Sequence, residues 1–475
     1  MENSLTKGTM YFLLANVAML ISTYTIHFWL GRYLPQELYG IYGIVFAFIN
    51  ITIISFSGMQ QSISKHIAEN LEKKDAIKAV SIKIQVIFSL ILTISYIILS
   101  TFITLYFFED ASLLKYLWVS ALVMPLYGIS AVFGYYLNGT HKFKKQATQI
   151  GIFSFSKLFF TILLAYYFKI MGVIIAFIIA AIFVVIYGYT QTKTTSPVRE
   201  EFDYKKLIRF ALPITFFTLF FTLFMNLDLL FVKSILKDNV QTAYYTVAAL
   251  IAKMPYSVLG ALTLITLPSL SFSISNNLKE RTSRIITQSL RFTFLILAPS
   301  SFIISSTSKE LVTFIYPTIY TEAAPVLSIL IFGVSFLILF FIISSIFNAA
   351  SKPYLPLILI ATLLPFLVIS NFILINKLGI LGGAISTTIF AFILLIWSSI
   401  LIYKKFKTFI PLLSFTRILI PSIFLFFLAK LMNLKGIFLF LEYGFLFLIY
   451  IIILIIIREV KKEDINKLKV LIKKN

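Results

Sequence analysis

Residues 9–30 read TMYFLLANVAMLISTYTIHFWL, 22 residues that contain no Lys, Arg, Asp or Glu. A helix needs about 20 mostly apolar residues to cross about 30 Å of hydrocarbon. This stretch is also too long for the apolar centre of a signal peptide, and it lacks a small-residue cleavage site. We therefore expect it to be a retained membrane-spanning helix.

Similar stretches fill almost the whole chain. Of its 475 residues, 59% are hydrophobic and 13% are charged, and the mean hydropathy is +0.96. A soluble domain needs more polar surface than this composition provides. We predict an all-α polytopic membrane protein of about 14 spans, near residues 9–30, 40–63, 80–107, 116–138, 147–168, 170–190, 207–233, 242–275, 285–307, 324–347, 354–376, 380–402, 412–431 and 437–457.

Basic residues predict the orientation of these spans. The net charge is +22, which in a soluble protein would suggest nucleic acid as a partner. Here most Lys and Arg fall in alternate loops, with pairs such as Lys73-Lys74 and Lys404-Lys405. Because cytoplasmic loops are enriched in these residues, we expect a multi-pass protein of the cell membrane with both termini cytoplasmic, and no nucleic-acid partner.

An internal repeat predicts the domain organisation. The segment 138–142 (NGTHK) ends one span, and 348–352 (NAASK) ends another about 210 residues later; the turn 169–172 (KIMG) matches 377–379 (KLG). We expect two six-helix lobes, 1–200 and 201–402, joined by a linker at 191–206. An appended helix pair and a basic cytoplasmic tail form 403–475. Six helices per half place the pseudo-two-fold axis along the membrane normal with a central cavity between the lobes, which suits alternating access.

Several motifs are similar to those of a known transporter family. Residues 31–42 (GRYLPQELYGIY) and 57–69 (SGMQQSISKHIAE) resemble the region around the second helix of the polysaccharide transporter family, and Asp228 followed by Tyr245 resembles its second half. That family belongs to the multidrug/oligosaccharidyl-lipid/polysaccharide (MOP) exporter superfamily. The resemblance implies a Wzx-type flippase, which moves isoprenoid-linked oligosaccharides from the cytoplasmic to the outer leaflet.

Charged and polar residues inside the spans are the candidate substrate-binding residues. A charge at the bilayer centre costs at least about 2.5–3.5 kcal/mol, and we expect Lys157 and Lys253 to lie deep in their spans, where they would hold a phosphate or pyrophosphate. Asp228 is the only acid that we expect to be buried. It either forms a structural salt bridge with Lys253 or modulates a phosphate-binding Lys253. Asn16, Asn50 and Asn226 would line the cavity and bind sugar, or bond neighbouring helices instead.

For two further residues, the sequence predicts a position relative to the membrane surface. His27 lies near the outer end of the first span, where we expect it at the membrane interface. Arg417 lies near the inner surface, which its side chain can reach by snorkelling.

Three classes of function compete. The first is the flippase, whose partners are membrane lipids and an oligosaccharide linked to an isoprenoid phosphate or pyrophosphate; we expect it to work as a monomer. The second is a cation-coupled multidrug antiporter of the same superfamily. The third, a membrane-embedded glycan polymerase or glycosyltransferase, is disfavoured because the longest outer loop, 307–323, has two Glu and no His.

The composition narrows the chemistry further. There is no cysteine, the three histidines are scattered, and no phosphate-binding glycine loop precedes a Lys-Ser/Thr pair. We therefore expect no catalytic residue, no metal and no cofactor.

Overall fold

The computed structural model describes residues 2–193, 202–256, 269–350, 352–432 and 434–459, and no strand occurs among them. Twelve helices in these ranges are long and apolar enough to cross a membrane. The prediction of an all-α polytopic membrane protein is confirmed. Part of the span predicted at 242–275, part of the predicted linker and most of the basic tail lie outside the described residues.

The chain divides into two compact units, Met1–Ala243 and Tyr244–Asn475. The boundary falls inside helix α10 (Asn239–Ala252). The predicted lobes, 1–200 and 201–402, rest on the sequence repeat and stay a prediction.

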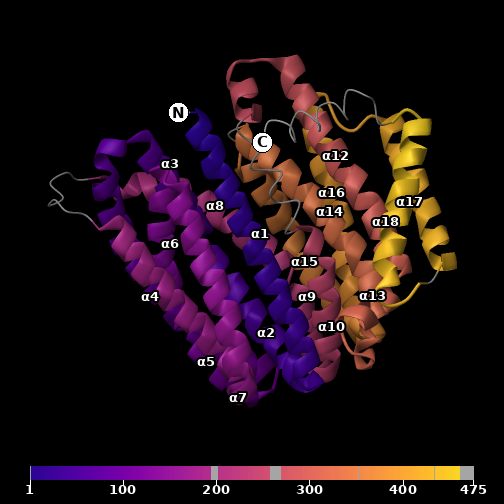
Figure 1. Cartoon of the computed structure of the whole chain (residues 1–475), viewed down its shortest axis with the longest axis horizontal. Helices are drawn as coiled ribbons and strands as arrows, with labels where there is room; N and C mark the ends of the chain where they lie inside the picture. The colour runs from indigo at the N-terminus through magenta and orange to yellow at the C-terminus, as the bar shows by residue number, and fades with distance from the viewer. Residues whose placement is uncertain (1, 194–201, 257–268, 351, 433, 460–475) are drawn as a thin grey trace. The chain divides into compact units, whose positions relative to one another are not determined.

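The first unit is a bundle in which α6 packs against α3, α4 and α7, and α1 lies along α7 (Figure 1). Ser57 and Ser62 of α3 bond Thr218 Oγ1 at 2.6 Å and the Leu207 carbonyl at 2.9 Å in α8. Because lipid tails are as apolar as these helices, such bonds and close packing hold the bundle together. Its helices are α1 (Glu2–Tyr33), α2 (Gln36–Ile53), α3 (Ser57–Glu69), α4 (Lys74–Phe102), α5 (Leu114–Ser120), α6 (Val123–Gly139), α7 (Phe143–Thr192), α8 (Tyr204–Phe224) and α9 (Leu227–Leu236).

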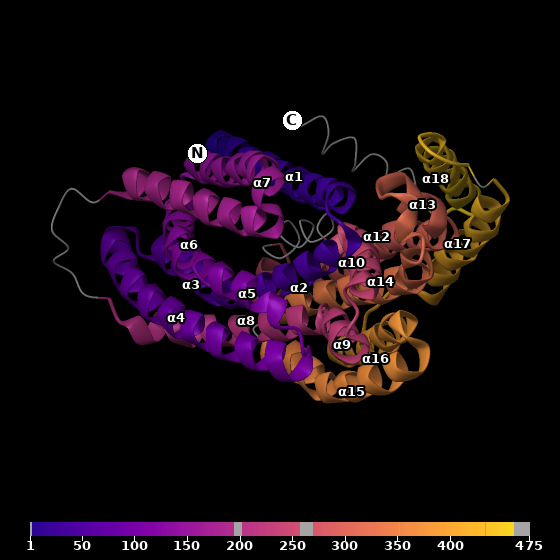
Figure 2. The same ribbon diagram turned by 90° about the horizontal axis from the view of Figure 1, so that it is seen from below.

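The second unit is built around α14, which carries no charged residue and is buried except along one partly exposed face. It packs against α12 and α16, while the final pair, α17 and α18, packs beside α12 (Figure 2). Ile303 of α12 meets Leu425 and Tyr450 of that pair in one apolar cluster. The helices are α12 (Lys279–Ser306), α13 (Ser308–Ile315), α14 (Ala323–Ala349), α15 (Tyr354–Leu378), α16 (Ile380–Phe406), α17 (Leu412–Met432) and α18 (Phe438–Ile456).

One helical hairpin occurs in both units. Lys169 interrupts α7 with φ 50° and ψ −127°, and Gly379 separates α15 from α16 with φ 60° and ψ −141°. A Cβ atom on Gly172 would lie 2.1 Å from the Leu164 carbonyl oxygen, and one on Gly382 would lie 2.1 Å from the Leu374 carbonyl oxygen. Residues eight apart are about 12 Å apart in a continuous helix, so the chain reverses at both sites and α7 contains two spans.

The hairpins give the register of the repeat. The sequence paired the turns at 169–172 and 377–379 without a residue-by-residue register, and in the structure Lys169 corresponds in conformation to Gly379 and Gly172 to Gly382. The sequence alone does not choose among the three glycines 379, 382 and 383 of the second turn, because only the backbone shows which one packs against the preceding helix.

The span predicted over 207–233 is two helices, α8 and α9, and not one. Asn226 Nδ2 donates to the Thr222 carbonyl at 2.7 Å, and the Asn226 N–H bonds the Leu223 carbonyl at 2.9 Å. The side chain thus takes the acceptor that the backbone would use in a straight helix, and the Asn226 backbone, with φ −131° and ψ −10°, leaves the helical conformation.

Candidate functional site

Lys157 is a buried cation in the first unit. It lies on α7, its side chain is only 4% exposed, and its Nζ donates to Thr23 Oγ1 of α1 at 2.8 Å. The ammonium also lies 5.6 Å and 5.2 Å from the ring centroids of Phe153 and Phe177. Among the described residues, no carboxylate lies within 4.0 Å of it. A hydroxyl and two aromatic faces therefore compensate a charge whose burial is expensive without an anion.

His27 belongs to the same region. It is 1% exposed, its Nδ1 lies 2.8 Å from Tyr42 Oη of α2, and Phe46 meets its ring edge-on at 4.5 Å. His27 lies one helical turn after Thr23, the hydroxyl partner of Lys157, on α1. The prediction that His27 is interfacial was wrong, because the aromatic residues of α2 enclose it within the protein.

The three predicted asparagines are partly buried. Asn16 Nδ2 donates to the Phe12 carbonyl of its own helix, α1, at 2.7 Å, as Asn226 does to Thr222. Asn50 lies on α2 near its last turn. Two of these amides therefore donate an N–H to the backbone carbonyl four residues earlier.

Asp228 and Lys253 lie in different compact units. Asp228 is 1% exposed on α9, and its Oδ1 accepts from the Leu229 N–H at 2.8 Å. Lys253 directly follows α10 and is half-buried. The predicted pairing of the two stays a prediction. The expectation that Asp228 is the only buried acid was wrong, since Glu442 and Glu459 are also buried.

Sequence reasoning missed a second buried lysine in the first unit. Lys233 Nζ of α9 donates to Asp110 Oδ2 at 2.7 Å and to Asn239 Oδ1 at 2.6 Å. Burial of Asp110 acts to raise the pKa of its carboxyl, but hydrogen bonds from Lys233 and Ser112 bring the pKa below its ordinary value. The only signal was Lys233 at the end of a predicted span, where a lysine usually snorkels to water.

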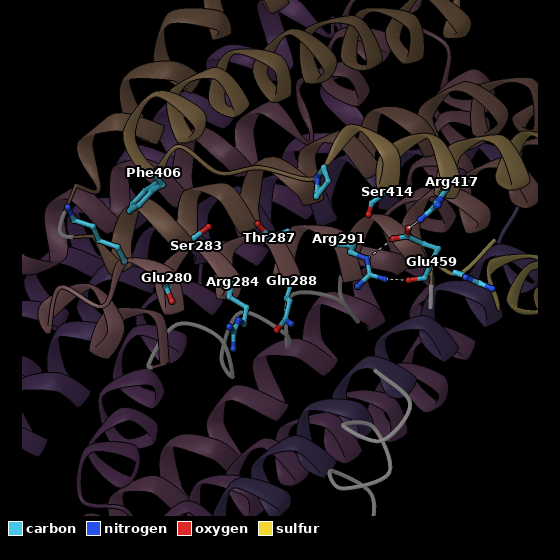
Figure 3. A pocket seen from close by; sticks show the side chains of 13 residues that line it. Glu280, Ser283, Arg284, Thr287, Gln288, Arg291, Phe406, Ser414, Arg417 and Glu459 are labelled. Carbon is cyan, nitrogen blue, oxygen red and sulfur yellow. Dashed lines mark hydrogen bonds and ion pairs between the residues drawn. The ribbon is translucent and has the colours of Figure 1, made fainter. Parts of the chain in front are cut away.

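A cationic pocket in the second unit was also missed. It has a volume of about 820 Å³ and lies where α12 and α17 begin and where α16 and α18 end (Figure 3). Its lining includes five cationic and two acidic side chains, Lys279, Arg284, Arg291, Arg417, Arg458, Glu280 and Glu459. From the sequence alone, we explained these basic residues by the excess of Lys and Arg in cytoplasmic loops.

Ion pairs neutralise part of the positive charge of the pocket. Arg291 Nε donates to Glu459 Oε1 at 2.7 Å, and its guanidinium also bonds the Glu459 carbonyl (Figure 3). Arg417 lies 3.9 Å from Glu459 Oε2 on the other side. Arg417, which we expected to snorkel, is one-third exposed and lines this pocket. One buried carboxylate thus ties α12 and α17 to the end of α18.

Comparisons with known proteins identify the family of the sequence and solved structures with a similar fold. A family model described as polysaccharide biosynthesis protein matches residues 29–325. A search of curated proteins finds no match. The solved structure of a lipid II flippase, MurJ, in an inward closed conformation is 17% identical, has a TM-score of 0.75, and covers 96% of this chain and 99% of that chain.

Two further solved structures share the fold. An inward-facing multidrug resistance MATE family transporter of the MOP superfamily is 14% identical with a TM-score of 0.67, covering 84% of this chain and 98% of that chain. A MOP superfamily transporter from Pyrococcus furiosus is 17% identical with a TM-score of 0.55, covering 85% of this chain and 94% of that chain. These neighbours are transporters and flippases built on the same polytopic helical architecture.

Proposed function

Because the chain belongs to the polysaccharide biosynthesis protein family and has the fold of MOP superfamily transporters, we propose that it is a flippase. Its cargo would be an oligosaccharide linked to an isoprenoid phosphate or pyrophosphate, moved from the cytoplasmic to the outer leaflet by alternating access. Similarity to the lipid II flippase along nearly the whole length of both chains supports a lipid-linked cargo.

The observation that carries the proposal is Lys157. A buried ammonium without a carboxylate partner among the described residues is a favourable place for an anionic oxygen. A phosphate matches it because the lysine ammonium is a compact charge with three donors, only one of which Thr23 takes. Lys157 and Lys253 would hold the phosphate, and Asp228 would set the position of Lys253.

Sugar recognition and the lipid tail complete the proposed cycle. Asn16, Asn50 and Asn226 would bond the sugar through their side-chain amides. The head group would cross within the protein while the isoprenoid tail stays in the lipid. No covalent bond is made or broken, so the cycle requires no catalytic residue and no cofactor. The protein would act as a monomer in the cell membrane with both termini cytoplasmic, without a nucleic-acid partner.

The alternative is a cation-coupled antiporter. Asp228 favours it, because a carboxylate that is 1% exposed can exchange a proton or bind sodium, and the fold is also that of MATE transporters. The two functions differ in the sign of the transported charge. A flippase cargo needs the buried cation, whereas an antiporter needs the buried carboxylate.

Flipping in proteoliposomes tests the proposal. The purified protein is reconstituted with a fluorescent lipid-linked oligosaccharide, and transfer is read by a sugar-oxidising enzyme added outside. Lys157→Gln should slow transfer about tenfold or more, because a hydrogen bond to a charged group is worth about 1.5–3 kcal/mol. Lys157→Arg should keep part of the rate. Lys115→Gln, which removes an exposed charge from α5, is the matched control. Equal rates for Lys157→Gln and Lys115→Gln would contradict the proposal.

A further inference from the structure

We propose that the cationic pocket of the second unit binds the phosphate of a membrane lipid, on the side that the sequence predicts to be cytoplasmic. This site lies in a different compact unit from Lys157 and does not depend on the cargo or on flipping. Its ligand class is a lipid whose head group carries an accessible phosphate, such as phosphatidic acid or an isoprenyl phosphate.

The charge of the pocket supports an anionic ligand. Five cationic side chains face two acidic ones, a surplus of three positive charges. Glu459 already pairs with Arg291 and Arg417. Within the part of the chain that the structure describes, Lys279, Arg284 and Arg458 make no ion pair, so they are the cations available to a ligand.

The other lining groups suit phosphate oxygens. Ser283 and Gln288 of α12 and Ser414 of α17 add hydroxyl and amide donors between the cations. Figure 3 shows Arg284 and Gln288 side by side, with Ser414 and Arg417 above the Arg291–Glu459 pair. Phosphate has several acceptor oxygens, so a ring of guanidinium, ammonium and hydroxyl groups can satisfy it from more than one helix.

The surroundings of the pocket favour a lipid over a soluble phosphate. The pocket lies at the ends of four helices that are candidate spans, which places it at the depth of lipid head groups. Large apolar side chains next to its lining residues are exposed on α17 and α18, among them Leu412, Leu413, Ile455 and Ile456. A phosphate held in the pocket would therefore keep its hydrocarbon chains against apolar protein surface and within the bilayer.

Binding to the purified full-length protein tests the site. We would titrate it in detergent with fluorescent phosphatidic acid and compare wild type with the double variant Arg284→Gln/Arg458→Gln. Each basic residue near an anionic lipid surface contributes about fivefold in affinity, so the double variant should bind about 25-fold more weakly. The control is Arg281→Gln/Lys404→Gln, which removes two exposed charges on the same side that do not line the pocket. The control should bind as wild type does.

A variant of opposite sign keeps the test decisive if the double variant does not fold. Glu280 is an exposed acid of the lining, and Glu280→Gln should tighten binding about fivefold. Competition separates the two sources of phosphate: unlabelled lipid should displace the probe, whereas inorganic phosphate or pyrophosphate at the same concentration should not. Equal affinity in both double variants, no effect of Glu280→Gln, or displacement by inorganic phosphate as effective as by lipid would each overturn the inference.

Discussion

The two hairpins predict stability changes of opposite sign at equivalent positions. Lys169 and Gly379 share a backbone conformation with φ between 50° and 60° and a strongly negative ψ. That region is open to glycine and strained for a residue with a Cβ atom, at a cost of about 1–3 kcal/mol. Lys169 therefore carries strain that Gly379 avoids.

The magnitude follows from two opposing terms. In Lys169→Gly the folded state loses about 2 kcal/mol of strain, while the unfolded chain gains freedom worth about 1 kcal/mol. The variant should therefore be more stable by about 1 kcal/mol. Gly379→Lys reverses both terms and should be less stable by a similar amount.

Thermal unfolding of the purified proteins in detergent measures the effect. The three tryptophans report unfolding by fluorescence. For a chain of this size about 1 kcal/mol corresponds to about 1–2 °C in Tm, so Lys169→Gly should rise and Gly379→Lys should fall by that amount. Lys193→Gly, at an exposed residue that follows α7, is the control for removing a lysine side chain. If Lys169→Gly lowers Tm while Gly379→Lys leaves it unchanged, the conformational argument and the equivalence of the hairpins are both refuted.

Three further results are expected. Gly172→Ala should lower Tm by several degrees, since its Cβ atom would meet the Leu164 carbonyl at 2.1 Å and the hairpin must open. Asp110→Asn should cost about 3 kcal/mol at pH 7 by leaving buried Lys233 unpaired; because the folded-state pKa of Asp110 is lowered, the wild-type advantage in Tm should be full above pH about 4 and shrink as the pH falls further. Asp228→Asn should weaken transport moderately under the flippase proposal; gradient-driven transport by wild type that this variant abolishes would instead identify Asp228 as a coupling site.

Much of the fold follows from local sequence. Long apolar stretches predict spanning helices one at a time, and the turns at 169 and 379 lie between spans that the sequence predicts. The break at Asn226 was not predictable, because an asparagine that bonds the carbonyl four residues earlier occurs both at a helix end and inside a helix. Asparagine occurs inside helices without breaking them, as Asn16 does in α1. The pattern of hydropathy is the same in both cases.

The candidate sites were less accessible to sequence reasoning because they depend on contacts between distant segments. Lys157 could be singled out from the sequence because it lies deep in an apolar stretch. The burial of His27 could not, because it depends on contacts with Tyr42 and Phe46 of another helix. The cationic pocket depends on residues 291 and 459, which lie on different helices and form one ion pair. Basic residues that gather around a pocket and basic residues that only set the orientation look alike in a linear sequence.

Three buried lysines of the first unit show why Lys157 is the one to test. Lys233 is 1% exposed and pairs with Asp110, and Lys78 is 7% exposed and lies 3.5 Å from Asp75. Both have the carboxylate that makes burial of an ammonium tolerable. Lys157 has a hydroxyl and two rings instead, and within the described ranges no acid takes the place of Asp110 or Asp75. Two of the buried lysines are thus paired with carboxylates of the protein, and no described carboxylate pairs with Lys157. The charge of Lys157 is therefore available to an anion that does not belong to the chain.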